Sequence, residues 1–273
     1  MHKNHPHRSE ILRVNDTLNR PLWSVMIPSF NCAKYLRETL QSVLSQDLGK
    51  ENMQIEVVDD CSDLDNPESV VNEIGKNRVN FFRQTYNVGT IKNFETCLLR
   101  SRGKIIHILH GDDCVCDCFY NVMSKAFEEN PEIGAAFCRQ IFIDEKSNWL
   151  SLSPLEETQR GILPNALERL AKEQRIMTPS IAVRREVYEK VGSFDDRLIC
   201  SEDWEMWVRI ASQYPIWYEP MPLALYRIHN DSNTGRHIRS GEEMKYNCFA
   251  IKIFQSYLPE AAADKITNQA KEM

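Results

Sequence analysis

The sequence predicts an α/β fold in which a mostly parallel central sheet is flanked by helices. Short apolar runs alternate with segments of helical spacing through about the first half of the 273 residues, which is typical of consecutive strand–helix units. Several of these apolar runs end abruptly in polar or acidic residues. Because ligands bind at the carboxyl ends of the strands in such sheets, these ends are candidates for a functional site.

The first half is expected to fold as alternating strands and helices. The expected strands cover residues 23–27, 54–58, 79–82, 104–110 and 134–143, and the expected helices cover residues 33–46, 67–74, 90–100 and 119–129. Apolar residues recur at helical spacing in the first helix, so one of its faces is expected to pack on the core. Asn31 is expected to cap this helix, and Pro67 suits the first turn of the next one.

The second half has a less regular pattern. Helices are expected over residues 164–172, 185–191, 201–213, 242–257 and 261–271, and strands over residues 180–183, 216–218 and 223–228. Ser201 is expected to cap the helix that it begins. The polar stretch 144–161 is expected to be a long loop, either a lid over a bound ligand or a plain surface insertion.

Both ends of the chain are expected to be tails. Residues 1–21 form a polar lead-in, and residues 1–10 are expected to be disordered, with a weak metal site at His2, His5 and His7 as the lesser alternative. Residues 233–273 are expected to form a helical tail. Its helix from Glu242 onward is expected to pack on the domain, and contact with a membrane surface is the less favoured alternative.

The composition limits the partners of the protein. The net charge is -6 and the isoelectric point is about 5.7, so there is no global basic field to attract nucleic acid. No apolar run approaches the roughly 20 residues that span a bilayer, and the start lacks the apolar core of a secretory signal. The nine cysteines, an odd number, indicate reduced thiols. The sequence therefore predicts a cytoplasmic protein with at most peripheral contact at the inner membrane face.

Two pairs of adjacent carboxylates follow expected strands. Asp112 and Asp113 end a buried run, and their mutual repulsion is costly unless a cation is present. Oxygen ligands suit Mn²⁺ or Mg²⁺, although a capped turn accounts for this pair about equally well. Asp59 and Asp60 could accept hydrogen bonds from a ribose or a base. Taken alone, this second pair is better explained as a local turn with Ser62.

A third acidic pair begins an expected helix. Glu202 and Asp203 complement the helix dipole, which is worth about 0.3–1 kcal/mol at exposed ends. Asp203 could instead act as a general base in a cleft, but the pair taken alone favours the structural role. Nearby aromatic residues are expected to belong mostly to the core, although one or two could stack on a sugar; they are Trp204, Trp207, Trp217 and Tyr218.

Three cysteines alternate directly after Asp112 and Asp113. Cys114, Cys116 and Cys118 are each separated by one residue, whereas zinc sites commonly leave two or more residues between paired cysteines. Free thiols are therefore favoured over a zinc site.

Several short motifs follow one another along the chain. They are VMIPSFN at 25–31, DDCS at 59–62, NVG at 87–89 with Asn93, LHGDD at 109–113, GSFD at 192–195, SEDWEMWVR at 201–209 and YRIH at 226–229. Each motif is weak alone, but chance would have to supply all of them in order. Together they resemble the signatures of family 2 glycosyltransferases over residues 22–232.

The resemblance implies a GT-A fold with two functional halves. Residues 22–143 would bind a nucleotide sugar, and residues 144–232 would bind the acceptor and supply the catalytic base, Asp203. By position in the motifs, the donor would be bound by Pro28, Ser29, Asn31, Asp59, Asp60, Asp112 and Arg227. The metal ion that bridges the diphosphate would be held by Asp112, Asp113 and His229.

The resemblance also implies a reaction. An inverting glycosyltransferase would use Mn²⁺ or Mg²⁺ to move a sugar from a nucleotide donor to a hydroxyl of a glycan or lipid-linked acceptor, in surface polysaccharide or glycoconjugate synthesis. UDP is the expected nucleotide, with GDP and dTDP as alternatives. His110 stands where the family often has an aspartate, which leaves fewer carboxylates at the metal site. The Gln-x-x-Arg-Trp motif of processive synthases is absent, which favours the addition of a single sugar.

Two other functions remain as alternatives. A non-catalytic protein that binds nucleotide sugars or glycans could share the same fold, because fold alone does not fix function. The presence of both Asp113 and Asp203 argues against that possibility. A dinucleotide-dependent oxidoreductase is disfavoured because no G-x-G-x-x-G turn follows the first strand.

Overall fold

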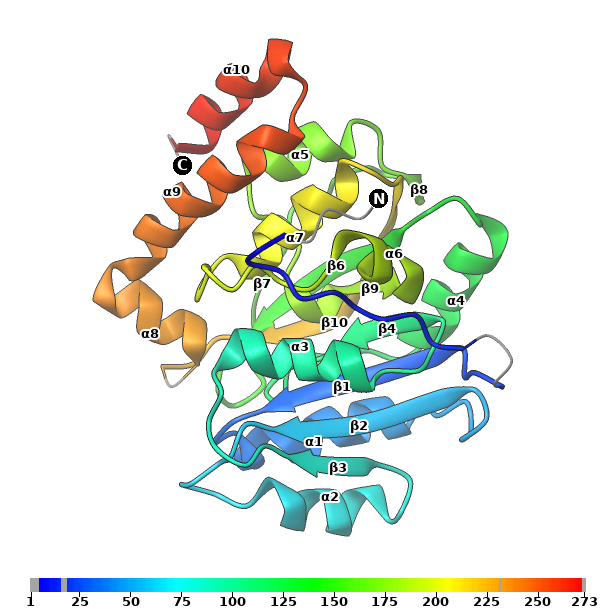
Figure 1. The fold of residues 1–273 in the computed structure, drawn as a ribbon. Helices are drawn as coiled ribbons and strands as arrows, with labels where there is room; N and C mark the ends of the chain where they lie inside the picture. Colours follow the sequence, from blue (N-terminus) through cyan, green and yellow to red (C-terminus); the bar gives the residue numbers. More distant parts are fainter. Residues whose placement is uncertain (1–4, 16–18, 231, 272–273) are drawn as a thin grey trace.

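The computed structural model describes residues 5–15, 19–230 and 232–271. The described strands form one mixed sheet (Figure 1). They are β1 (Trp23–Ser29), β2 (Met53–Asp59), β3 (Asn80–Arg83), β4 (Ile105–Ile108), β5 (Cys114–Val115), β6 (Ala135–Ile143), β7 (Trp149–Leu152), β8 (Gly161–Ile162), β9 (Ile181–Arg184) and β10 (Ile216–Arg227). The order is β3-β2-β1-β4-β9-β6-β10-β5, with β7 paired to β6 and β8 paired to β10.

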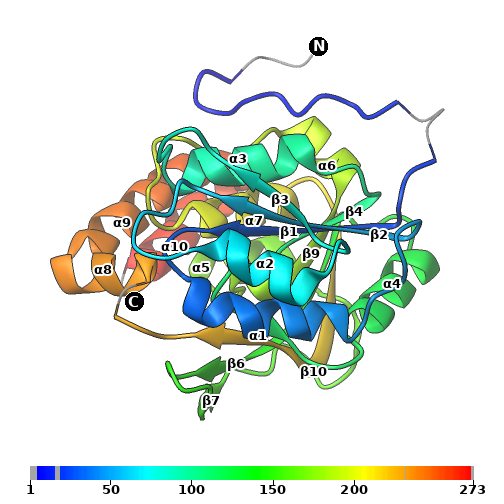
Figure 2. The ribbon, with the colours of Figure 1, turned by 90° about the horizontal axis from the view of Figure 1, so that it is seen from below.

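Helices cover this sheet on both sides. They are α1 (Ala33–Leu44), α2 (Pro67–Gly75), α3 (Thr90–Arg100), α4 (Phe119–Glu129), α5 (Ala166–Lys172), α6 (Arg185–Val191), α7 (Glu202–Ala211), α8 (Asn233–Ser240), α9 (Glu242–Phe254) and α10 (Glu260–Lys271), with the short turns η1 (Thr178–Ser180) and η2 (Gln255–Tyr257). α1 and α2 lie on one face of the first strands and α3 lies on the other (Figure 2). α8, α9 and α10 run along one side of the molecule.

The first half of the chain forms the parallel part of the sheet. β3, β2, β1 and β4 pair in parallel, and every residue of β1 and β2 is buried, as expected for parallel strands covered on both faces. The chain runs outward from β1 to β3 and then returns to β4 on the other side of β1. This reversal makes a crevice at the carboxyl ends of β1 and β4. The predicted alternation is confirmed here.

The second half adds antiparallel pairs, so the sheet is mixed. β9 enters between β4 and β6 and is antiparallel to both. β10 joins the two strands expected over 216–218 and 223–228. Pro220 and Pro222 suggest a break because proline cannot donate to a ladder, but β10 continues with register shifts between Glu219 and Ala224. β5 was not predicted, because two residues show no periodicity.

α1 begins without the predicted Asn31 cap. Cys32 precedes the helix, and its side chain makes no capping hydrogen bond. The Ala33 N–H is instead donated to the Asp65 carboxylate over 2.7 Å. Asn31 accepts the N–H groups of residues 63 and 64 with its side-chain oxygen. The cap prediction is wrong because a carboxylate distant in sequence satisfies the helix end, which leaves Asn31 to join two loops.

The first part of the stretch 144–161 is a hairpin with β6, and residues 153–160 connect it irregularly to β8. β7 pairs antiparallel with β6, and the Asp144 carboxylate accepts the N–H groups of Lys146 and Asn148 in the turn between them. All four residues of β7 are exposed, so no buried face marks this strand in the sequence. No residue of the stretch lines the main cavity of the described structure.

The C-terminal helices pack on the domain. This was the prediction favoured over contact with a membrane surface. α9 contacts α7, α8 and α10, and it buries Ala250, Ile251 and Phe254. None of the described helices has the length and apolar character that crossing a membrane requires.

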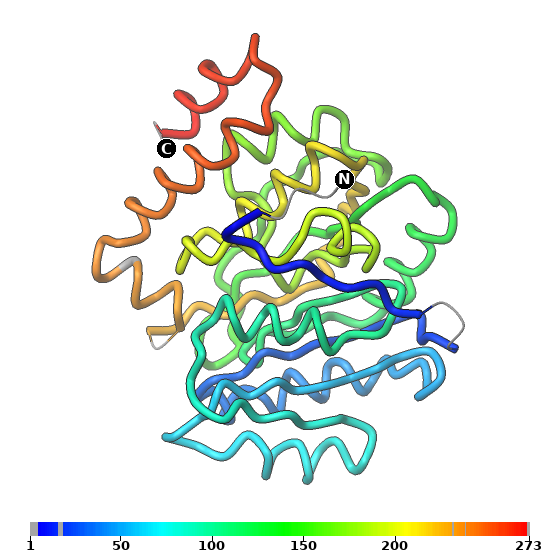
Figure 3. The backbone as a smooth tube through the Cα atoms, in the orientation of Figure 1, coloured from blue at the N-terminus to red at the C-terminus, as the bar shows by residue number. Residues whose placement is uncertain are grey.

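Residues 5–15, here called the N-terminal strap, lie along the outside of the molecule (Figure 3). Disorder was expected up to residue 10, but His7 and Ser9 accept backbone hydrogen bonds from the segment after α6, and Ile11 is 1% exposed. His5 and His7 join no potential metal-binding group among the described residues. His2 lies outside those residues.

Arg8 is expected to hold the strap in place. Its guanidinium reaches the Asp195 and Glu205 carboxylates, each at 3.2 Å, and both carboxylates are fully buried. Arg8→Ala should lower the free energy of unfolding by about 2 kcal/mol, less than for an isolated buried pair because each carboxylate keeps a second arginine. Urea unfolding would measure it.

His7 provides the control for this prediction. It pairs with Asp196 at 3.1 Å, and both side chains are about 40% exposed, so His7→Ala should change the free energy of unfolding by less than about 1 kcal/mol. Equal losses in the two variants would contradict a special contribution from Arg8.

Candidate functional site

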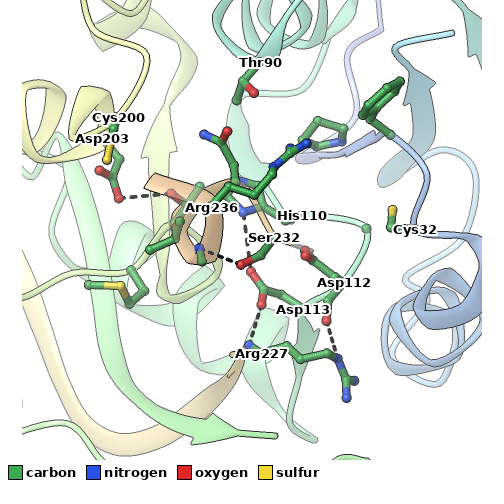
Figure 4. A pocket seen from close by; sticks show the side chains of 18 of the residues that line it. Cys32, Thr90, His110, Asp112, Asp113, Cys200, Asp203, Arg227, Ser232 and Arg236 are labelled. Carbon is green, nitrogen blue, oxygen red and sulfur yellow. Dashed lines mark hydrogen bonds and ion pairs between the residues drawn. The ribbon is translucent and has the colours of Figure 1, made fainter. Parts of the chain in front are cut away.

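The main cavity lies at the crevice between β1 and β4 and has a volume of about 620 Å³. Its walls come from the loops after β1, β4 and β10, from the start of α7 and from α8. Gly111 allows two of these loops to meet, because a Cβ there would lie 2.8 Å from Cys32 Sγ and 3.3 Å from the Pro28 carbonyl oxygen. Asp112 and Asp113 lie on one side of the cavity and Asp203 on the other (Figure 4).

The loop after β4 carries a potential metal-binding group. One ligand atom each from His110, Asp112 and Asp113 lies within 4.8 Å of the others. The buried atoms His110 Nε2 and Asp113 Oδ2 have no hydrogen-bond partner among the described residues. Buried polar atoms without partners are costly, and a divalent cation would satisfy them. These residues therefore fit a metal ion, and His110 supplies a nitrogen where the family often has a carboxylate.

The two aspartates differ in their electrostatics. Burial and the charge of Asp112 raise the pKa of Asp113 well above its usual range. Burial also acts to raise the pKa of Asp112, but the hydrogen bond with His229 and the charge of His110 outweigh it, and this pKa is lowered. Burial lowers the pKa of His110, so its ring is neutral at pH 7 and can act as a ligand. A bound cation would favour ionisation of both carboxylates.

His229 reaches the same place from the end of β10. Its Nε2 lies 2.9 Å from Asp112 Oδ2, and its ring centroid lies 4.8 Å from that of Tyr35. Its buried Nδ1 has no hydrogen-bond partner within the described structure. His229 thus contacts one member of the group, and its predicted place near the metal stays a prediction.

Six of the seven residues predicted at the donor site line the cavity: Pro28, Ser29, Asn31, Asp60, Asp112 and Arg227. Asp60 also shapes the wall, because its carboxylate accepts the N–H groups of Val88 and Gly89 at 2.7 and 2.9 Å. Burial raises the pKa of Asp60 against these two hydrogen bonds.

Asp59 is not brought to the cavity. Its side chain is fully buried, and its carboxylate accepts hydrogen bonds from the N–H and hydroxyl of Ser62 and from the Arg83 guanidinium. The local turn with Ser62, the alternative explanation of this pair, holds for Asp59. Asp59 therefore stabilises the turn at the end of β2, and Asp60 lines the cavity.

The Arg227 guanidinium is held by groups of the protein. It donates to the backbone oxygens of Asp112 and Asp144 and to the Glu38 carboxylate, and its side chain is fully buried. Arg227 also lines the cavity, and its expected contact with phosphates stays a prediction. Its contact with the Asp112 backbone holds the loop after β4.

Arg236 on α8 is a cationic cavity residue that the sequence did not reveal. It lines the cavity, and Figure 4 shows its side chain between Asp203 and the metal-binding group. Its side-chain nitrogens make no hydrogen bond within the described structure. No local pattern marks it, because α8 follows β10 without a conspicuous apolar stripe in the sequence.

Asp203 lies in the first turn of α7. Ser201 precedes the helix but makes no capping hydrogen bond, so that prediction is wrong; its hydroxyl donates to Asn247. Burial raises the pKa of Asp203 to about 6, although hydrogen bonds from the Trp204 N–H and the Gln174 amide oppose the shift. The pKa of its neighbour Glu202 is also raised, by burial and by the charge of Asp203.

The predicted aromatic cluster belongs to the core. Trp204, Trp207 and Tyr218 are at most 4% exposed, and neither they nor Trp217 line the cavity. The aromatic residues that do line it are Phe30, Phe94, Phe142 and Tyr226.

All nine cysteines, each among the described residues, are free. Cys114, Cys116 and Cys118 take part in no potential metal-binding group there.

Comparison with known proteins gives a family match and related sequences. The family model described as Glycosyl transferase family 2 matches residues 24–192. An uncharacterized glycosyltransferase of Methanocaldococcus jannaschii is 28% identical over 239 residues, which covers 86% of this chain and 80% of the relative. An uncharacterized glycosyltransferase of Rickettsia typhi is 26% identical over 235 residues, 82% of this chain and 69% of the relative.

Solved structures give a fold match. S. aureus TarS 1–349 in complex with UDP-GlcNAc has a TM-score of 0.72 at 16% identity, covering 91% of this chain and 71% of that one. A mannosyltransferase from Pyrobaculum calidifontis in complex with GDP-Man and Mn²⁺ has a TM-score of 0.67 at 17% identity, covering 98% of this chain and 73% of that one. These likenesses confirm the predicted GT-A fold.

Proposed function

This chain belongs to glycosyltransferase family 2, and on that premise we propose that it transfers one sugar, with inversion, from a nucleoside diphosphate sugar to an acceptor hydroxyl. The observation that carries this proposal is the single cavity lined by Asp112, Asp113 and Asp203. One wall has a group that fits a divalent cation, and the opposite wall has a carboxylate with a pKa of about 6. A site for a diphosphate and a proton acceptor therefore face one space.

The donor is assigned to the side formed by the ends of β1 and β4. Pro28, Ser29 and Asp60 would contact the base and ribose. Asp112 and Asp113 would hold Mn²⁺ or Mg²⁺. His110 lies beside these two aspartates, and His229 contacts Asp112. When bound, that ion would neutralise the negative charge that builds on the departing diphosphate.

Asp203 is the proposed acceptor of the proton from the acceptor hydroxyl. The acceptor oxygen forms a bond to the anomeric carbon while its hydroxyl proton passes to the Asp203 carboxylate. The bond between the anomeric carbon and the diphosphate oxygen breaks, and both electrons leave with the nucleoside diphosphate. Attack from the face opposite the leaving group inverts the configuration. Holding donor and acceptor in this arrangement supplies much of the rate.

Release of nucleoside diphosphate tests the proposal. Wild-type protein with Mn²⁺ is incubated separately with UDP-GlcNAc, UDP-glucose, GDP-mannose and dTDP-glucose, and the free diphosphate is measured with and without an acceptor mixture of glycans and lipid-linked sugars. Turnover of one donor that requires the metal supports a transferase. Tight binding of a donor without turnover would favour the non-catalytic alternative.

The remaining parts of the proposal concern the cellular setting. UDP is the proposed nucleotide. The chain is proposed to have a donor-binding half over residues 22–143 and an acceptor-binding half over residues 144–232. The proposed acceptor is a glycan or lipid-linked sugar in polysaccharide or glycoconjugate synthesis. The nine free cysteines support a cytoplasmic location.

Arg236 is expected to contact the diphosphate. A guanidinium without protein partners at the cavity would form charge-assisted hydrogen bonds with phosphate oxygens. Arg236→Ala should weaken nucleoside diphosphate binding about 10-fold, which is the effect of one such contact. Calorimetric titration would measure the change.

Arg239→Ala is the matched control for this prediction. Arg239 is on the same helix, donates to the Asn230 backbone oxygen and does not line the cavity. Unchanged affinity in Arg236→Ala, or an equal loss in both variants, would contradict the assignment.

A further inference from the structure

Gln174 makes a contact with Asp203 that the proposed reaction does not itself explain. Its side-chain Nε2 lies 2.9 Å from Asp203 Oδ1 and 3.0 Å from Oδ2, so one amide group contacts both carboxylate oxygens. Thr178 Oγ1 lies farther away, at 3.4 Å from Oδ2. Gln174 lies between α5 and η1, 29 residues before Asp203 in the sequence, and it lines the cavity.

The backbone around Gln174 is fixed by its neighbours. The next residue, Arg175, accepts a hydrogen bond from the Gln140 side chain on β6 and pairs with Glu156 at 2.8 Å. Ile176 is fully buried in the core. The backbone on the C-terminal side of Gln174 is therefore held by contacts within the protein.

An amide N–H in this position acts on the carboxylate in two ways. It can only donate, so it stabilises the ionised carboxylate and not a protonated oxygen facing it. It also spans both oxygens, which fixes the rotation of the carboxylate plane. Oδ1 also accepts the Trp204 N–H over 2.7 Å, so Oδ2, whose other contact is Thr178 Oγ1 at 3.4 Å, is the oxygen placed to accept a proton from the cavity.

We propose that Gln174 is a positioning residue that keeps Asp203 ionised and sets the orientation in which it receives the acceptor proton. This inference rests on the proposed function, in which Asp203 is the base. It assigns Gln174 a part in the reaction although its side chain need not touch either substrate.

Several other titratable or charged groups surround Asp203. They are Glu202 and Cys200 beside it, Tyr226 on β10, Arg236 on α8 and Glu243 on α9, all lining the same cavity. A change at Gln174 leaves all of them in place. A change in the Asp203 pKa in such a variant can therefore be attributed to the lost amide contact.

The first test measures the pKa of the Asp203 carboxyl by carbon-13 NMR of protein labelled at aspartate, with the signal assigned by its loss in Asp203→Asn. In Gln174→Ala the pKa should rise by about one pH unit, the size expected for a hydrogen bond to a charged group. Gln174→Glu should raise it further, because a second carboxylate is placed beside the first. Gln41→Ala is the control, since Gln41 is exposed on α1. An unchanged pKa in folded Gln174→Ala would overturn the inference.

The second test separates this inference from the proposed function. The rate of diphosphate release is followed between pH 5 and 9 with the donor that wild type turns over, or with the slow transfer to water. The acid limb in Gln174→Ala should move upward by the same amount, with a loss of about 5-fold at pH 6 and a smaller loss at pH 9. If Asp203→Asn is inactive while Gln174→Ala keeps the wild-type profile, only the inference fails. If Asp203→Asn remains fully active, the base assignment itself fails.

Discussion

Asp203→Asn should lower the rate of sugar transfer by about 10²- to 10⁴-fold, the usual contribution of a general base. Asparagine has nearly the same shape, and its oxygen can still accept the Trp204 N–H, which donates to Asp203 Oδ1 over 2.7 Å. What it loses is the ability to take a proton. Donor affinity should change little, because the proposed donor residues lie at the ends of β1 and β4. Initial rates and calorimetric titration on the same preparations would measure both quantities.

The pH dependence of the transfer rate tests the role of the Asp203 carboxylate in a second way. Burial raises the pKa of Asp203 to about 6, so the carboxylate is ionised above pH 6 and protonated below it. Because only the ionised form is a base, kcat/KM should fall about tenfold per pH unit below that value and be level above it. Asp196→Asn is a control, since Asp196 is exposed and lies outside the cavity. Activity near the wild-type level in Asp203→Asn would remove the base assignment.

Asp113→Asn should abolish the effect of Mn²⁺ on nucleotide binding. Asp113 Oδ2 is buried without a hydrogen-bond partner among the described residues, and Asp112 beside it raises the pKa of Asp113. Loss of a ligand at such a position should weaken metal affinity by at least about 100-fold, since even supporting residues contribute 10- to 100-fold. Titration of UDP and GDP, each with Mn²⁺ or with EDTA, would detect the loss.

Thermal unfolding distinguishes this effect from simple damage to the fold. In EDTA, Asp113→Asn should unfold at the wild-type temperature or above it, because the variant removes a buried carboxyl beside a like charge. In Mn²⁺ only the wild type should gain stability, because the ion binds its folded form. Asp117→Asn, at an exposed position between β5 and α4, should behave as wild type. A Mn²⁺-induced rise of equal size in Asp113→Asn would rule out Asp113 as a ligand.

Local sequence patterns located most elements of the fold. Thr90–Arg100 forms α3 as expected, because its helical spacing and the following glycine are properties of neighbouring residues. The predictions of strands failed where neighbouring residues show no pattern or a misleading one. β7 is exposed along its whole length, and β10 continues through two prolines that suggested a break.

The sequence likewise predicted some residues of the candidate site and not others. The sequence placed Asp112, Asp113 and Asp203 at the ends of elements, and the structure brings all three to one cavity. It could not show that Arg227 donates to Glu38, 189 residues away, or that the Gln174 amide holds Asp203. Such contacts depend on how distant segments pack.

The sequence by itself determined the strand–helix alternation of the first half, the ordered motifs and the acidic residues at strand and helix ends, because these depend on chain spacing. The tertiary structure decided which side chains are free to act. Arg227 and Asp59 are committed to buried hydrogen bonds within the protein, since a buried polar group must be paired. Arg236, His110 and Gln174 became part of the site because folding brings them to the cavity from separate elements.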